Sequence, residues 1–181
     1  MTALRHGTDD WTVADLAELP DDGNQYEILD GMLLVTPAPV VRHQVAALRL
    51  AVLLDNARRE GLSVLIAPVD WQPEKSTSLQ PDVLVVRDLD LDAANITAPP
   101  ELVVEVLSPS TRRKDLLLKR SRYEEAGIPS YWIVDPKEPS LVALELQDGV
   151  YTEAARATGG ETLDLSLPFP VRITPGALVT G

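Results

Sequence analysis

Two short apolar runs, each accompanied by one acid, constrain the fold of this chain more than any other feature. The runs are residues 83–86 and 102–104, and the acids are Asp82 and Glu105. Short runs of Val and Leu with proline nearby are typical of buried strands. Because acids are rarely buried without a partner, each of these must meet a cation or lie in a cleft. The two acids are 23 positions apart, which allows two neighbouring strands and a loop. We therefore expect the two acids to converge at one end of a sheet.

The first half of the chain predicts a short helix, a hairpin and a long helix. Thr12, followed by Asp15, indicates a capped helix that stops at Pro20. The apolar segments on either side of Asp30 and Gly31 predict a hairpin, because this pair supplies the positive φ angles of a tight turn. Residues 42–61 predict the longest helix, with an apolar face at Val45, Leu48, Ala51 and Val52 and a stop at Gly61.

The second half predicts strands joined by one helix and ends in a hairpin. Strands are expected at 63–67, 81–86, 101–107 and 129–134, a helix from about 112 to 126, a hairpin over 141–155, and a strand end and loop at 68–78. This order predicts an α+β fold, an α/β sandwich with a mixed central sheet flanked by helices and with N- and C-terminal hairpins. The chain length of 181 residues predicts one domain, residues 1–181, with a flexible tail at 1–10.

The residue types present narrow the chemistry and the compartment. The chain has no Cys, which excludes disulfides and thiolate metal sites. Two adjacent carboxylates repel each other unless a cation lies between them, and their oxygens suit Mg²⁺ or Mn²⁺. Glu27, inside the first hairpin strand, is a candidate third acid. No signal peptide and no run of apolar residues long enough to span a membrane is present, so we expect a cytoplasmic protein with no membrane partner.

Lys119 is the candidate cation for these acids. Leu116, Lys119, Tyr123 and Ala126 follow helical spacing and share one stripe, which turns Lys119 toward the apolar side. A lysine in that position needs an acidic partner. The simpler alternatives are an ordinary surface ion pair between Lys119 and Asp115, a solvated Asp82 and a solvent-facing Glu27.

Clustered cations suggest a local anion-binding face on an acidic protein. The net charge of −12 argues against a general polyanion binder. Six of the 16 cations nevertheless lie within eleven residues: Arg112, Arg113, Lys114, Lys119, Arg120 and Arg122. A second group is Arg42, Arg49, Arg58 and Arg59. Arg42, His43, Arg112, Arg113, Lys114 and Arg122 are therefore the candidate substrate-binding residues, although His43 could equally be a surface residue and the basic run a solvated face.

Five ordered blocks resemble one family. They are YEILDG at 26–31, HQ at 43–44, QPDV at 80–83, VEVLSPST at 104–111 and YWIVDP at 131–136. Together they are similar to the Uma-type putative restriction endonucleases of the PD-(D/E)XK nuclease superfamily. The resemblance implies a restriction-endonuclease-like core with Asp82 and Glu105 as metal ligands and Glu27 as the acid from an earlier element. The motif lysine should stand at position 107, where this chain has Leu107.

The sequence thus predicts an Mg²⁺- or Mn²⁺-dependent DNA endonuclease with Glu27, Asp82, Glu105 and Lys119 as catalytic residues. Lys119 takes the place of the lysine absent at Leu107, as lysine migration in this superfamily implies. A duplex cut on both strands needs two sites, so we expect a homodimer. The alternative is a catalytically inactive nuclease-like module that binds nucleic acid or a protein partner; both Leu107 and the net charge favour it.

Overall fold

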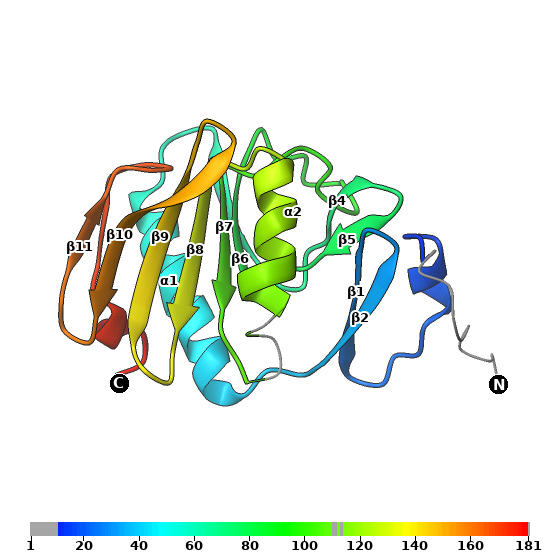
Figure 1. Cartoon of the computed structure of the whole chain (residues 1–181), viewed down its shortest axis with the longest axis horizontal. Coiled ribbons are helices and arrows are strands. Elements are labelled where there is room, and N and C mark those ends of the chain that lie inside the picture. Colours follow the sequence, from blue (N-terminus) through cyan, green and yellow to red (C-terminus); the bar gives the residue numbers. More distant parts are fainter. Residues whose placement is uncertain (1–10, 110–111, 113, 181) are drawn as a thin grey trace.

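A six-stranded mixed sheet forms the centre of the molecule (Figure 1). The computed structural model describes residues 11–109, 112 and 114–180. In spatial order the strands are β10 (Val150–Thr158), β9 (Ser140–Gln147), β8 (Ser130–Asp135), β7 (Leu102–Val106), β6 (Val83–Arg87) and β3 (Leu62–Ile66). Neighbours are antiparallel except for β7 and β8, which are parallel. The predicted mixed sheet is confirmed.

Strands β6 and β7 lie in the middle of this sheet because their side chains are apolar on both faces. Val85 and Val104 belong to one buried cluster, whereas Leu84 and Val103 belong to another on the opposite face. Every residue of β7 is buried, Glu105 included. Continuous apolar strands of this kind require cover on both sides.

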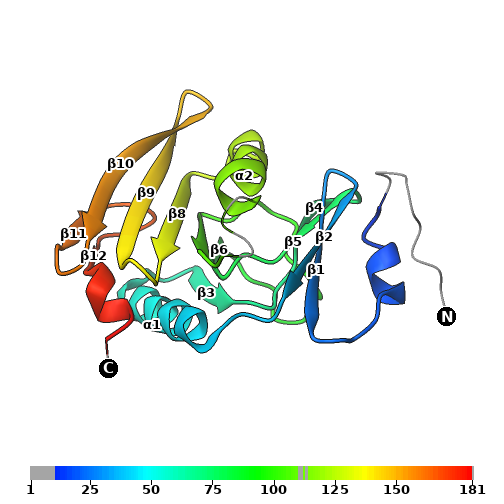
Figure 2. The same ribbon diagram turned by 60° about the horizontal axis from the view of Figure 1, so that its bottom comes forward.

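The two helices provide that cover from opposite faces, as Figure 2 shows. Helix α1 (Val41–Ala57) packs on one face. The connection from β7 to β8 crosses the other face as a π-helical segment, η2 (Lys114–Lys119), that continues into α2 (Arg120–Glu125). A parallel strand pair needs such a crossover, and the predicted helix before Gly127 is the one that supplies it.

The buried face of α1 agrees only in part with the predicted one: Ala51 is buried and Val45 half-buried, but the other two predicted residues are exposed. Leu48 and Val52 are 53% and 52% exposed. The buried residues of the helix are His43, Ala46, Ala47, Leu50, Ala51 and Leu54. Alanines weigh little in a periodicity argument, yet their small side chains let the helix approach the sheet closely. The helix also ends at Ala57, four residues before the expected Gly61, because Arg58 takes an extended conformation with φ −61° and ψ 153°.

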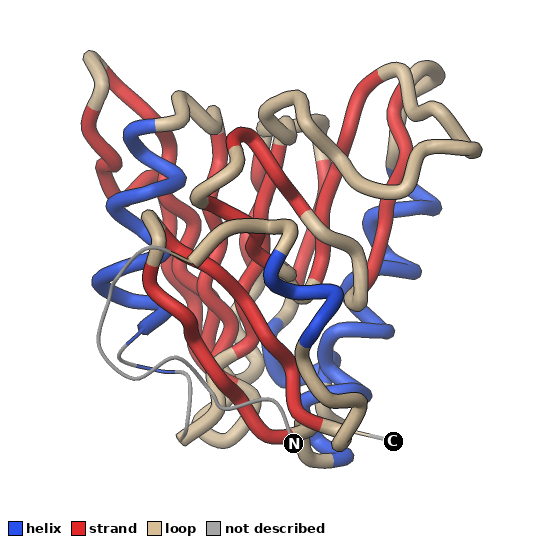
Figure 3. The backbone as a smooth tube through the Cα atoms, turned by 90° about the vertical axis from the view of Figure 1, so that its right-hand side faces the viewer, coloured by secondary structure: helices blue, strands red, loops and turns tan. Residues whose placement is uncertain are grey.

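A second, four-stranded sheet stands beside the first. Its order is β2 (Met32–Pro37), β1 (Asn24–Leu29), β5 (Thr77–Leu79) and β4 (Trp71–Glu74). The predicted hairpin between β1 and β2 is confirmed, with φ angles of 50° at Asp30 and 82° at Gly31. The β4–β5 hairpin was expected as a strand end and loop; its strands are too short and polar to be recognised without the pairing to β1. Figure 3, viewed from the side of this small sheet, shows the strands with a helix on either side.

Short elements complete the two ends. At the N-terminal side, Asp15 accepts hydrogen bonds from the backbone and hydroxyl of Thr12 at 2.9 and 2.8 Å, at the start of a short 3₁₀ helix. The predicted cap by Thr12 is wrong, because the N-cap residue is Ala14 and no side chain caps this helix. That helix is η1 (Asp15–Glu18). The predicted hairpin of β9 and β10 is confirmed, and after it come β11 (Leu163–Leu165), β12 (Val171–Ile173) and η3 (Pro175–Leu178). The tail expected at 1–10 lies outside the described residues.

Candidate active site

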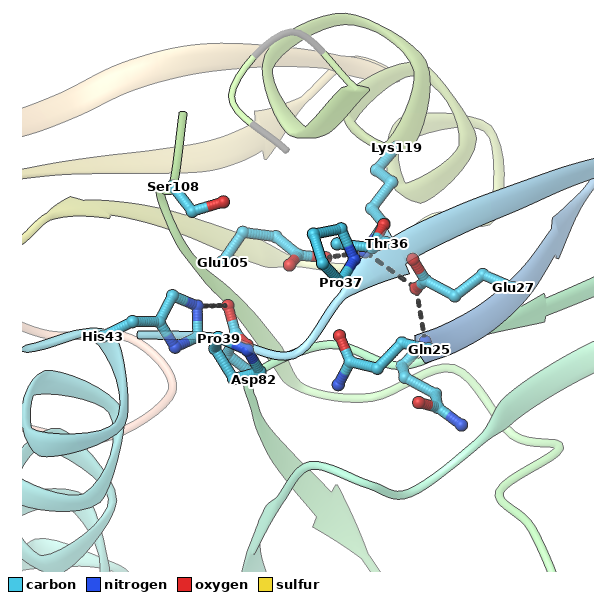
Figure 4. Close-up of a pocket in the computed structure, with 11 residues that line it drawn as sticks. Gln25, Glu27, Thr36, Pro37, Pro39, His43, Asp82, Glu105, Ser108 and Lys119 are labelled. Carbon is cyan, nitrogen blue, oxygen red and sulfur yellow. Dashed lines mark hydrogen bonds and ion pairs between the residues drawn. The ribbon is translucent and has the colours of Figure 1, made fainter. Parts of the chain in front are cut away.

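A small cavity lies where the two sheets and both helical segments meet (Figure 4). It is lined by Gln25, Glu27, Thr36, Pro37, Pro39, His43, Gln80, Asp82, Glu105, Ser108 and Lys119. Its volume is about 20 Å³, enough for one water-sized species and too small for a nucleotide. The four predicted catalytic residues all line it, although they come from four different elements of the sequence.

Asp82 is held at the entry to β6. Its Oδ2 atom accepts a hydrogen bond of 2.7 Å from the backbone N–H of Val106, on the neighbouring strand. The same oxygen lies 3.2 Å from Nε2 of His43. The antiparallel register that pairs Val83 with Val104 brings Asp82 beside the end of β7. Asp82 is therefore anchored in the sheet and is not the freely solvated acid of the simpler alternative.

Glu105 projects from β7 toward α2. Successive strand residues alternate between faces, so Glu105 points away from α1, against which Val104 and Val106 pack. It is 2% exposed. Its Oε1 accepts hydrogen bonds from Nζ of Lys119 at 3.1 Å and from Oη of Tyr123 at 2.6 Å. A buried glutamate in a valine strand is thus paired and hydrogen-bonded, as its burial requires.

Glu27 enters the site from the small sheet. Its side chain lies on β1 and is 4% exposed. Its Oε1 accepts a 2.8 Å hydrogen bond from the backbone of Gln80 and lies 2.8 Å from Nζ of Lys119. Glu27 therefore links the small sheet to the helical crossover that carries Lys119, and it does not face water.

Lys119 is the cation shared by two acids. It is 4% exposed, and Figure 4 shows it reaching down between Glu27 and Glu105. The predicted stripe is confirmed, because Tyr123 is also buried and Leu116 and Ala126 pack against the same apolar cluster. The ammonium group of Lys119 therefore forms buried ion pairs with Glu27 and Glu105.

Position 107, where the motif lysine is expected, faces the same side of the sheet as Lys119. Leu107 is 6% exposed and packs in the cluster on the α2 side of the sheet. It stands two residues after Glu105, so both side chains face α2. A lysine at position 107 and the lysine at position 119 would thus approach Glu105 from the same side of the sheet.

Tyr123 is a site residue that the sequence argument treated only as part of an apolar stripe. Burial raises the pKa of its hydroxyl well above the ordinary value, and the negative charge of Glu105 raises it further. Its ring centroid lies 5.7 Å from that of Trp71 and 5.4 Å from that of Tyr131. The four-residue spacing from Lys119 was the signal available in the sequence, since such residues share a helix face.

Among the expected substrate-binding residues, only His43 lines the cavity within the described residues. It is 5% exposed and contacts Asp82, so it is not a surface residue. Arg42 is exposed and precedes it at the start of α1. The side chain of Arg42 therefore lies in solvent, whereas that of His43 lies in the cavity.

The cations after β7 are largely engaged elsewhere. Arg112 lies 2.6 Å from Asp135, and Arg122 pairs with Asp30 at 3.3 Å and with Glu74. Burial acts to raise the pKa of Asp135, but hydrogen bonds from Arg112 and two backbone amides outweigh it, and the pKa lies below its ordinary value. Arg113 lies outside the described residues, as does the side chain of Lys114.

The charges that line the cavity do not balance. The carboxylates of Glu27, Asp82 and Glu105 face the single ammonium of Lys119. Acidic side chains therefore outnumber the ammonium group in the described lining of the cavity. Excess negative charge in a buried site is costly unless a cation compensates it. A bound divalent cation would compensate such an excess.

The donor set fits a hard cation held partly by water or substrate. Within residues 11–109, 112 and 114–180, no group of three or more His, Cys, Asp or Glu side chains is placed to hold a metal ion by itself. Mg²⁺ commonly uses one or two carboxylates and keeps several waters or substrate oxygens. Asp82 and Glu105 meet that requirement, and their hydrogen bonds to neighbouring groups orient them.

Comparisons with known proteins show the family from the sequence and the fold from a solved structure. The family model described as Uma2, putative restriction endonuclease, matches residues 13–178. The crystal structure of a putative nuclease of the DUF820 family from Anabaena variabilis ATCC 29413 superimposes with a TM-score of 0.71 at 16% identity, covering 93% of this chain and 97% of that one. At this identity the likeness shows the nuclease-like fold alone. No curated protein matches the chain.

No helix among the described residues is long and apolar enough to cross a membrane.

Proposed function

Because the chain belongs to the Uma2 family of putative restriction endonucleases, we propose that it hydrolyses phosphodiester bonds in DNA with the help of Mg²⁺ or Mn²⁺. The observation that carries this proposal is the placement of Lys119 between Glu27 and Glu105 in the cavity that Asp82 also lines. The carboxylates could neutralise a divalent cation, and that cation together with the lysine could offset the negative charge of a phosphate.

Asp82 and Glu105 would hold the metal. Asp82 would present Oδ1, since its side-chain contacts with the Val106 backbone and with His43 are both made through Oδ2. When bound, the metal would polarise the phosphate and make water a better nucleophile. The backbone N–H of Val106 and the side chain of His43 would keep Asp82 oriented, and His43, which lines the cavity, is also a candidate contact for the substrate.

Lys119 would supply the positive charge nearest the reacting phosphate. In the structure this charge is shared by Glu27 and Glu105. A fixed ammonium can orient water and stabilise the negative charge that develops on phosphate oxygens. Glu27 would keep the ammonium in place, with its own Oε1 fixed by the Gln80 backbone.

DNA would bind outside the cavity, with only the reacting phosphate approaching it. Arg42 is exposed beside the site and is the first candidate for a backbone phosphate. We also propose Arg112, Arg113, Lys114 and Arg122 as phosphate contacts, although Arg112 and Arg122 must exchange their present acidic partners to serve. Such contacts give salt-sensitive binding with little sequence preference. A cytoplasmic homodimer would place two sites on one duplex.

Plasmid cleavage in Mn²⁺ tests this function. Wild-type protein should nick or cut the plasmid, whereas Asp82→Asn and Lys119→Met should lose most of the activity. Two surface variants serve as matched controls: Asp164→Asn, whose partner is Arg172, and Lys137→Met, which is exposed. Equal nicking by all five proteins would refute the catalytic assignment.

A catalytically inactive nuclease-like module is the second candidate. The small volume of the cavity and the engagement of Arg112 and Arg122 by acids favour it. In that case wild-type protein would leave the plasmid intact but bind DNA or a stoichiometric protein partner. Absence of DNA binding at low salt would refute both nucleic-acid functions.

A further inference from the structure

The hydroxyl of Tyr123 makes a contact that packing alone does not require. Tyr123 is fully buried, and its Oη lies 2.6 Å from Oε1 of Glu105. An ionised carboxylate only accepts hydrogen bonds, so the tyrosine donates. Hydrogen bonds of this length to a charged acceptor are among the stronger ones in proteins. A phenylalanine would fill the same space without this bond.

The position of that hydroxyl is set by the core. The ring of Tyr123 on α2 lies between Trp71 of β4 and Tyr131 of β8, at centroid distances of 5.7 and 5.4 Å. Both neighbours are fully buried. Side chains from two strands therefore flank the ring, and close packing restricts its movement.

Tyr123 and Lys119 act on the same oxygen of Glu105 but in different ways. Lys119 has a long, flexible side chain and shares its ammonium with Glu27. Tyr123 is rigid and makes this hydrogen bond from a fixed ring. The orientation of the Glu105 carboxylate is thus defined more firmly by the tyrosine than by the lysine.

We propose that Tyr123 is a positioning residue of this site: it holds Oε1 of Glu105 toward α2 and so sets the orientation in which this acid meets a divalent cation. The inference rests on the proposed function. Groups that orient metal-binding side chains typically change metal affinity or activity by about 10- to 100-fold when they are removed. We expect a loss in this range from Tyr123→Phe.

Tyr151→Phe is the matched control. Tyr151 is 3% exposed, its ring centroid lies 5.8 Å from that of Tyr131, and its hydroxyl donates to the backbone of Ile128 at 2.9 Å. It therefore loses a buried tyrosine hydroxyl from the same aromatic row without touching the cavity. A merely structural role of Tyr123 would make the two variants behave alike.

Manganese binding is measured directly from the electron paramagnetic resonance signal of free Mn²⁺, alongside kcat and KM for plasmid DNA. Tyr123→Phe should weaken Mn²⁺ binding and lower kcat with little change in KM for DNA, while Tyr151→Phe should match wild type. Unchanged Mn²⁺ binding in Tyr123→Phe, with binding lost in Asp82→Asn, would overturn the positioning role and leave the proposed function standing. Wild-type protein that binds no Mn²⁺ would overturn both.

A second measurement does not depend on a destabilising substitution. Fluorotyrosine placed at position 123 or 151 of the otherwise unchanged chain reports on each hydroxyl through its ¹⁹F resonance. Addition of Mg²⁺ should shift the resonance at 123 and leave that at 151 unchanged. Equal shifts, or none at 123, would overturn the inference.

Discussion

Removal of the positive charge at Lys119 should destabilise the folded protein strongly. Its side chain is 5% exposed, and Nζ lies 2.8 Å from Glu27 and 3.1 Å from Glu105. Lys119→Met keeps much of the apolar stem but leaves two buried carboxylates without their cation. Loss of one partner from a buried ion pair costs about 3–5 kcal/mol, and we expect the free energy of unfolding to fall by about this amount near neutral pH.

A surface ion pair supplies the scale for this effect. Arg172 pairs with Asp164 at 2.7 Å, but the two side chains are 74% and 70% exposed. Arg172→Met should therefore cost about 0–1 kcal/mol. Urea unfolding, followed by circular dichroism, measures both variants under the same conditions.

The cause of the loss can be separated from a packing defect. If uncompensated charge destabilises Lys119→Met, the added substitution Glu27→Gln should recover part of the stability, because it removes one of the two charges. Excess Mn²⁺ should also recover part of it, by about 2.7 kcal/mol at 100 times the dissociation constant. The reasoning would be refuted by a loss no larger than that of Arg172→Met, or by a double variant less stable than Lys119→Met.

Three further predictions test the position of the lysine, the buried face of α1 and the charge of Asp135. Leu107→Lys in the Lys119→Met background should restore part of the plasmid cleavage, because residue 107 faces the same side as Glu105; cleavage no better than in Lys119→Met would contradict this. Leu54→Ala should cost about 2–5 kcal/mol and Leu48→Ala under about 0.5 kcal/mol in urea unfolding, since the first is fully buried and the second 53% exposed. Asp135→Asn should cost about 1 kcal/mol near neutral pH, and unfolding at lower pH should show the difference vanish below the depressed pKa of the folded acid, where wild type is protonated too.

The central part of the fold could be predicted because its signals are local. The apolar runs of β6 and β7 and the turn at Asp30 and Gly31 each depend on a few adjacent residues. The stripe through Lys119 and Tyr123 depends on helical spacing alone. These signals predicted that Asp82 and Glu105 converge and that Lys119 turns toward the apolar side, and the structure places all three in one cavity.

The remaining features depend on contacts between distant parts of the chain. Short strands β4 and β5 exist because they pair with each other and because β5 pairs with β1. The buried face of α1 is decided by which side can approach the sheet, so alanines displaced Leu48 from the core. The engagement of Arg122 by Asp30 and Glu74 brings together three elements whose proximity no local pattern indicates.

The two strand and helix positions of the site should differ in how well they tolerate insertions and deletions. Glu105 depends on strand alternation, and a slip of one residue in β7 would turn it to the α1 face. Lys119 instead arrives on the crossover between two parallel strands, where a helix can shift by a fraction of a turn and still reach the acid. Insertions and deletions in this family should therefore be absent from β7 yet accepted in the connection before Lys119. We expect the sequence position of the lysine to vary among family members and the position of Glu105 to stay fixed.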